Sequence, residues 1–92
     1  MATYFMFGKY SPEAIRQISK ARTGEVTKII KQCSGELREG YALLGEKDLA
    51  LIVDFPGNDQ AVKASVQLSR STGICFSCTP AVTVQEFDNL VA

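Results

Sequence analysis

The stretch at residues 49–53 places the strongest constraint on how this chain folds. It follows a glycine-containing turn and runs on to Pro56-Gly57, which is typical of a β-strand. Successive side chains of a strand point to opposite faces of the sheet. The three odd-numbered residues, all Leu or Val, therefore share one face, and Ala50 and Ile52 share the other. Both faces are apolar, so both need a cover.

The start of the chain shows the same two-sided pattern. Residues 3–8 are rich in aromatic side chains, which favour strands. Tyr4 and Met6 share one face, and the opposite face carries Phe5 and Phe7. This stretch lacks a basic front and a small-residue cleavage site, so we interpret it as a first strand and not as a signal peptide.

Turn and capping signals divide the remaining sequence into further elements. In chain order we expect a strand over residues 3–8, a helix over 12–33, strands over 36–44 and 49–55, a helix over 59–72, a strand over 74–82 and a short helix over 84–91. The strands at 36–44 and 49–55 are expected to form a hairpin through a tight turn at residues 45–47.

Local signals also predict how the helices begin and end. Arg22-Thr23-Gly24 interrupts the apolar face of the first helix, and a glycine inside a helix costs about 1 kcal/mol relative to alanine, so a bend or break is expected there. Ser34-Gly35 supplies a C-terminal glycine for this helix. Asn58 is expected to cap the second helix, and Thr83 the short last one.

The order β-α-β-β-α-β predicts an α+β fold of the ferredoxin-like type, with a four-stranded antiparallel sheet and a short C-terminal helix. Ninety-two residues make a single domain, residues 1–92. Right-handed crossovers place both helices on the same side of the sheet. The face with Ala50 and Ile52 then needs another cover, and a second copy of the same sheet is the economical one. We therefore expect a face-to-face homodimer or a larger homo-oligomer.

Composition narrows the classes of function. The chain has ten basic and ten acidic residues, so nothing favours nucleic acid or a membrane surface as a partner. The longest apolar run is too short to cross a bilayer. The chain has no histidine, the usual haem and metal ligand and the usual base at neutral pH, and no metal or cofactor is expected. Three cysteines, an odd number, favour reduced thiols in the cytoplasm.

Three polar residues are candidates for a site near the central strand. Asp48 and Asp54 lie at the two ends of the face that holds Ala50 and Ile52. A carboxylate at the mouth of an apolar cavity has a raised pKa and acts as a base, whereas a carboxylate in a turn or at a strand end is simply solvated. Tyr41, on the neighbouring strand, either donates a hydrogen bond to a ligand or packs in the core or an interface.

Tyr4 and Arg22 are further candidates. Tyr4 has the same two interpretations as the other strand tyrosine, and Arg22 either reaches an anionic ligand or remains a surface arginine. Cys75 and Cys78 have the C-x-x-C spacing, but residues three apart on a strand point to opposite faces, so we expect two unlinked thiols. Cys33, at a helix end, is expected in the core.

A series of short motifs occurs in the order found in one protein family. They are Tyr4, Ser11-Pro12-Glu13, Arg22-Thr23, Gly35, Tyr41, Leu44-Gly45-Glu46, Asp48-Leu49, Ile52-Val53, Phe55-Pro56 and the closing segment from Pro80 to Phe87. In these motifs the chain resembles the GYD-domain proteins, small bacterial proteins. The resemblance implies a ferredoxin-like fold that assembles as a dimeric α+β barrel. Lys47 replaces the tyrosine of the family motif Gly-x-Tyr-Asp.

The resemblance implies a fold but no particular activity, because the wider superfamily includes cofactor-free monooxygenases, isomerases, haem enzymes and ligand-binding regulator domains. Three functions remain. The first, which we favour, is a homo-oligomeric small-molecule-binding or regulatory module, with a small hydrophobic ligand in a pocket against the sheet and Tyr41 and Asp48 as polar contacts. The second is a cofactor-independent enzyme in which Asp48 is the base and Tyr41 orients the substrate oxygen. The third is a structural oligomer without a ligand.

Overall fold

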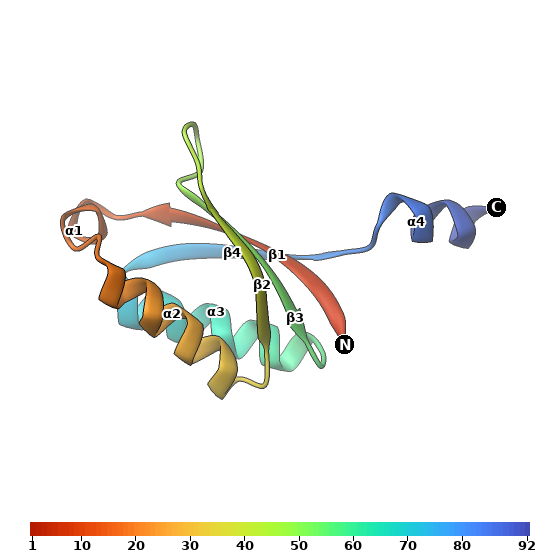
Figure 1. Cartoon of the computed structure of the whole chain (residues 1–92), viewed down its shortest axis with the longest axis horizontal. Helices are drawn as coiled ribbons and strands as arrows, with labels where there is room; N and C mark the ends of the chain where they lie inside the picture. The colour runs from red at the N-terminus through yellow and green to blue at the C-terminus, as the bar shows by residue number, and fades with distance from the viewer.

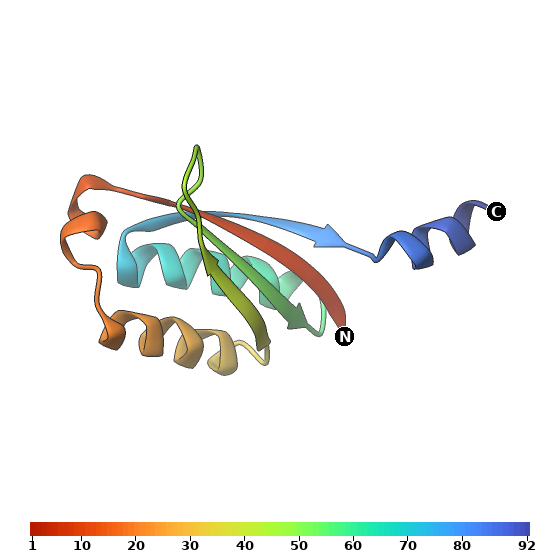
Figure 2. The same cartoon turned by 45° about the horizontal axis from the view of Figure 1, so that its top comes forward.

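The computed structural model describes residues 1–92 and confirms the predicted α+β, ferredoxin-like architecture. Its elements are β1 (Ala2–Tyr10), α1 (Pro12–Arg16), α2 (Lys20–Gln32), β2 (Glu36–Ala42), β3 (Leu49–Phe55), α3 (Asn58–Thr72), β4 (Ile74–Ala81) and α4 (Val84–Val91). The strands lie in the order β2-β3-β1-β4, and each neighbouring pair is antiparallel. Figures 1 and 2 show α2 and α3 side by side on one face of this sheet.

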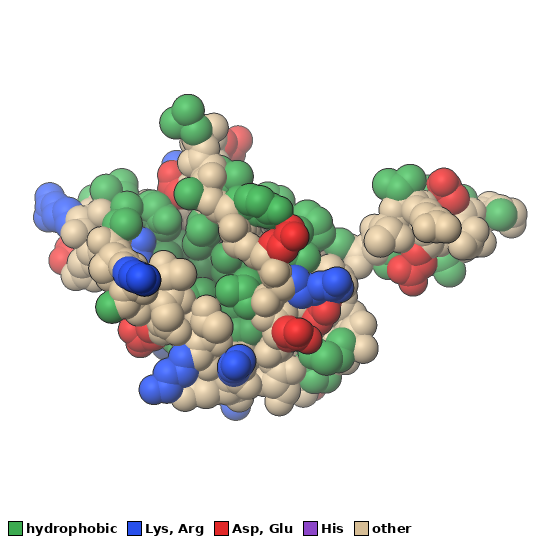
Figure 3. Space-filling view, in the orientation of Figure 1, with side chains coloured by type: hydrophobic (Ala, Val, Ile, Leu, Met, Phe, Trp, Pro, Cys, Tyr) green, Lys and Arg blue, Asp and Glu red, His purple; other side chains and the backbone are tan.

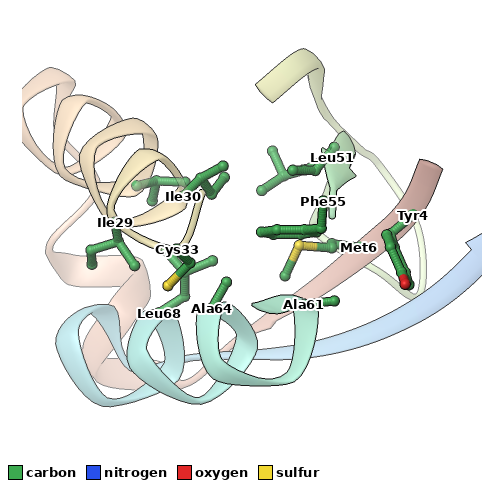
Figure 4. Close-up of a cluster of buried hydrophobic side chains, with 12 residues drawn as sticks. Tyr4, Met6, Ile29, Ile30, Cys33, Leu51, Phe55, Ala61, Ala64 and Leu68 are labelled. Atoms are coloured by element: carbon green, nitrogen blue, oxygen red, sulfur yellow. The ribbon is translucent and has the colours of Figure 1, made fainter. Parts of the chain in front are cut away.

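The helix-covered face of the two central strands forms the core. Tyr4 pairs with Val53 and Met6 with Leu51, and all four side chains are buried. Figure 4 shows this cluster between the sheet and the two helices, with Phe55 at its centre. The other members of the cluster are Val26, Ile29, Ile30, Cys33, Ala61, Ala64 and Leu68. Each large apolar side chain buried here contributes roughly 1.5–3 kcal/mol to stability.

The opposite face of the same strands has no helix over it. There Phe5 pairs with Ile52 and Phe7 with Ala50, and all four residues are half-buried. The rings of Phe5 and Phe7 lie 6.3 Å apart between centroids. We call these four residues the open face. The prediction that the central strands are apolar on both sides is confirmed.

The break in the first helix lies earlier than predicted. The chain leaves α1 after Arg16 and begins α2 at Lys20, whereas Gly24 lies inside α2 with open space where a side chain would be. Ser19 sets the new start, because its hydroxyl accepts a hydrogen bond from the backbone N–H of Arg22 at 3.1 Å. The helix tolerates the glycine, and the cap decides where it begins.

The end of α2 also differs from the prediction. The residue in the left-handed conformation is Ser34, with φ of 63°, and not Gly35. The N–H of Gly35 donates to the carbonyl of Ile30 at 2.9 Å, and that of Ser34 to Lys31 at 3.0 Å, which is a Schellman ending. Gly35 is needed for close approach, because a Cβ there would lie 2.5 Å from Cε1 of Phe55.

Two further local predictions were wrong. Asn58 does not cap α3: Gly57 occupies that position without a side-chain hydrogen bond, and the Asn58 side chain accepts from Tyr4. The strand predicted to reach Leu44 ends at Ala42, and residues 43–48 form a loop longer than the predicted tight turn. Figures 1 and 2 show this loop rising from the sheet on the side away from the helices.

The last helix stands apart from the rest of the molecule (Figures 1 and 2). Its start is as predicted, since the Thr83 hydroxyl accepts from the N–H of Glu86 at 3.1 Å. Its apolar residues Val84, Phe87, Leu90 and Val91 are all more than half exposed. None of the four helices is both long enough and apolar enough to span a lipid bilayer.

Two glycine substitutions test this account of α2. Gly35→Ala should lower the free energy of unfolding by about 1–3 kcal/mol, because the new methyl group collides with Phe55 in the core. The matched control Gly24→Ala should raise it by about 0.5–1 kcal/mol, because it adds helix propensity in open space. Urea denaturation followed by circular dichroism measures both, and equal effects of the two changes would contradict the account.

Candidate functional site

Two apolar pockets open between the helices and the sheet. We call the first the Arg22 pocket; it has a volume of about 440 Å³ and lies between the N-terminal half of α2 and the end of the sheet formed by β2 and β3. The second, the Tyr4 pocket, has a volume of about 410 Å³ and lies between α3 and β4. Figure 3 shows hydrophobic side chains at the bottom of the hollow between α2 and β2.

The strands form the apolar wall of the Arg22 pocket. Leu37, Leu49 and Leu51 line it from the helix side of the sheet. Gly40 belongs to the same wall, and a Cβ there would lie 3.2 Å from Cδ2 of Leu51. The glycine therefore keeps β2 free of a side chain at this place. The opposite wall comes from Ile18 and α2.

Arg22 is the only charged residue that lines this pocket. Its guanidinium carbon lies 5.1 Å from the centre of the Tyr10 ring, a cation–π arrangement. One of its N–H groups donates to the carbonyl of Ala14, in the middle of the short helix α1. No carboxylate lies within 4.0 Å of the guanidinium, since the ion pairs of the chain involve other residues. Arg22 thus joins α1 to α2 and still has free donors.

Tyr41 borders the Arg22 pocket, but its side chain belongs to the other face of the sheet. Tyr41 pairs with Ala50, and the phenol donates a hydrogen bond to Glu39 at 2.5 Å. This hydrogen bond and the negative charge of Glu39 raise the pKa of the Tyr41 phenol. The side chain is 51% exposed, so Tyr41 is a neutral, accessible group on the margin of the open face.

Asp48 ties the loop before β3 to the end of β1. Its carboxylate accepts a hydrogen bond from the backbone N–H of Tyr10 at 2.8 Å and lies 3.9 Å from the ammonium group of Lys9. Its own N–H donates to the carbonyl of Gly8 at 2.9 Å. Asp48 lines neither of the two apolar pockets. The Asp48 carboxylate therefore stabilises the backbone at the end of β1. It does not share a pocket with Tyr41.

Asp54 lies at the other end of the same strand. Its carboxylate accepts from the hydroxyl of Thr3 at 2.8 Å and from the guanidinium of Arg38 at 3.3 Å. It also lines neither of the apolar pockets. These contacts connect β1, β2 and β3 at the same end of the sheet.

Tyr4 lines the second pocket with its ring and is otherwise a core residue. Its hydroxyl donates to the side-chain oxygen of Asn58 at 2.5 Å, and its ring meets that of Phe55 edge to face at 5.7 Å. Cys78 lies in the same pocket, where burial raises the pKa of its thiol. The thiol therefore stays protonated at neutral pH.

The three cysteines lie where the strand and helix patterns place them. Cys75 pairs with Lys9 and Cys78 with Met6, so the two thiols point to opposite faces of the sheet. Both are free, and Cys33 is a buried member of the core. No group of three His, Cys, Asp or Glu side chains is close enough to hold a metal ion.

Of the five candidate residues, the structure places Arg22 and Tyr41 around one pocket and Tyr4 in another. Tyr10 was missed by the sequence reasoning, although it contacts Arg22 through its ring and Asp48 through its backbone. An aromatic residue directly before the Ser-Pro start of a helix was the available signal. Its two partners are 12 and 38 positions away in sequence, so no local pattern could pair them.

The four-stranded antiparallel sheet with both long helices on one face defines a ferredoxin-like α+β protein. The family model of the GYD domain matches residues 4–91, and the chain belongs to the GYD-domain family. No curated protein matches the sequence.

A solved structure with a similar fold is the crystal structure of the leucine response regulatory protein LrpA from Mycobacterium tuberculosis. The TM-score is 0.59 at 8% sequence identity, and the match covers 90% of this chain and 51% of that one. The present chain thus spans about half the length of that protein. At this identity the likeness concerns the fold alone.

The contacts of Asp48 lead to a prediction about stability. Asp48→Ala should lower the free energy of unfolding by about 1–3 kcal/mol, because the N–H of Tyr10 loses a charged acceptor. Asp48→Asn should cost less, since an amide oxygen still accepts this bond. Chemical denaturation measures both, with Glu46→Ala in the same loop as the control. A stability equal to that of the wild type in Asp48→Ala would contradict the structural role.

Proposed function

We propose that this protein is a homo-oligomeric module that binds a small, largely apolar molecule, in the manner of a ligand-sensing regulator and not of an enzyme. The observation that carries the proposal is the Arg22 pocket. Its volume of about 440 Å³ falls within the range of about 300–1,000 Å³ typical of small-molecule sites. Its lining is mostly hydrophobic, with a few polar groups, which is also typical of such sites.

What favours binding over catalysis is the placement of the polar groups. The base of the enzyme hypothesis, Asp48, accepts a backbone hydrogen bond and lines neither apolar pocket. The phenol of Tyr41 donates to Glu39 on the other side of the sheet. General acid–base catalysis requires the base within hydrogen-bond reach of the substrate, so neither residue is well placed for chemistry in the Arg22 pocket.

The regulatory part of the proposal has support in the fold comparison. LrpA is described as a leucine response regulatory protein, and its fold matches 90% of this chain. Fold does not determine function, so this analogy adds to the pocket and does not replace it. We further propose a cytoplasmic location, because three unpaired cysteines suit a reducing compartment.

Three apolar surfaces without a cover support the homo-oligomer. The first is the open face, built on Phe5 and Ile52. The second is the tip of the loop after β2, where Leu44 is fully exposed, and the third is the apolar side of α4. The loop rises over the open face, and α4 extends beyond the sheet (Figure 1). A second copy of the chain would cover all three at once, whereas a monomer would leave them in water.

Charge placed on the open face tests the oligomer. Ile52→Lys should convert the wild-type dimer or larger assembly to monomers, because a lysine at the centre of a sheet-to-sheet interface is left buried and unpaired. The measurement is light scattering after size-exclusion chromatography. Val62→Lys, on an exposed part of α3, is the matched control and should leave the assembly intact. A wild-type protein that is monomeric at micromolar concentration would contradict the proposal.

The binding function itself is tested by native mass spectrometry of protein purified from its own source. We expect a homo-oligomer that retains a small molecule, released under mild denaturation. The control is a variant whose pocket is filled by its own side chain. Ala42→Phe places a phenyl ring on the β2 wall of the Arg22 pocket and should abolish retention of the small molecule. An oligomer that retains nothing, and whose melting temperature no apolar small molecule raises, would contradict the proposed function.

A further inference from the structure

We infer that the ligand of the Arg22 pocket is a small carboxylic acid with an apolar body, whose carboxylate binds the Arg22 guanidinium. The inference rests on the proposed function and names the chemical class of the ligand. Its basis is a set of four observations on the pocket: an arginine without an acidic partner, a fixed guanidinium, a basic helix and an apolar opposite wall.

The first observation is that Arg22 has no acidic partner. Its side chain lines the pocket and is partly exposed, and its hydrogen bond within the chain goes to the neutral carbonyl of Ala14. The two ion pairs of the chain, Arg38 with Asp54 and Lys9 with Asp48, do not involve Arg22. A guanidinium has five N–H donors in a planar fork that matches a carboxylate. Arg22 therefore has donors left for an external anion.

The second observation is that the guanidinium is already held in place. The centre of the Tyr10 ring lies 5.1 Å from the guanidinium carbon, and one N–H of the guanidinium donates to the carbonyl of Ala14. A side chain that is ordered before binding loses little conformational entropy when the ligand arrives. The arrangement is therefore favourable for binding and not only for stability.

The third observation concerns charge. The segment 12–33, which contains α1 and α2, has five basic and two acidic residues, although the whole chain has no net charge. Figure 3 shows Lys and Arg side chains along α2 beside the hollow. A cleft beside one sign of charge attracts ligands of the opposite sign. The helix side of the pocket thus favours an anionic ligand over a cationic one.

The fourth observation is the apolar wall opposite Arg22, formed by Leu37, Leu49 and Leu51. A polyphosphate would need several cations, and the pocket has one. It would also leave this wall without a partner. A ligand with one carboxylate and an aliphatic or aromatic body satisfies both the guanidinium and the wall.

A pair of probes with an eight-carbon chain and different head groups, a carboxylate or a hydroxyl, tests the inference. We expect isothermal titration calorimetry to detect tighter binding of octanoate than of 1-octanol by the wild-type protein. Arg22→Gln should weaken octanoate binding by about 10- to 100-fold and leave 1-octanol binding nearly unchanged, because a charge-assisted hydrogen bond is lost. Arg70→Gln, an exposed arginine on α3, is the matched control and should change neither.

Arg22 also joins α1 to α2, so the folded state of each variant is checked by circular dichroism. Arg22→Lys keeps the charge without the planar fork and should give an intermediate octanoate affinity. Ala42→Phe should block both probes. If the two probes bind equally well and Arg22→Gln changes neither, the carboxylate inference is overturned while the pocket remains a binding site. If neither these probes nor any other apolar molecule binds, the proposed function fails as well.

Discussion

The pairing of β1 with β3 is the interaction on which the rest of this structure depends. Because the two strands are antiparallel and in register, Tyr4 and Met6 lie beside Val53 and Leu51 on one face, and the aromatic residues between them lie on the other. The first face binds α2 and α3 and forms the core. The same alternation sends Phe5, Phe7, Ala50 and Ile52 to the second face, which is therefore also apolar. The second copy of the chain that we propose would therefore cover residues of the same two strands that build the core.

The position of the pocket depends on where the first helix is broken. The chain leaves α1 early and starts α2 at the Ser19 cap, which puts Arg22 in the first turn of α2, above Tyr10. A glycine in the opposite strand, Gly40, keeps the wall free of side chains at the same level. Two local features, a cap and a missing side chain, therefore create the space that we propose binds a ligand.

The order of strands and helices predicted the fold, and the alternation of side chains along the strands predicted the two apolar faces of the sheet, because side-chain direction on a strand is set by geometry alone. The same alternation also predicted the divergence of Cys75 and Cys78. The prediction of a break at Gly24 was wrong because the penalty of about 1 kcal/mol for a helical glycine is no larger than what a single cap contributes. The partners of Asp48 and Arg22 could not be predicted, since both converge on Tyr10 through contacts that only the folded chain creates.

Arg22 connects the fold to the proposed function in one further way. Its hydrogen bond to Ala14 connects α1 to the first turn of α2, and the same guanidinium would hold the carboxylate. A ligand at that position binds only the folded chain, because Tyr10, Arg22 and Ala14 are not held together in the unfolded chain. At a ligand concentration of 100 times Kd, this linkage adds about 2.7 kcal/mol of stability. Ligand binding would therefore stabilise the folded chain, including the contact that Arg22 makes between α1 and α2.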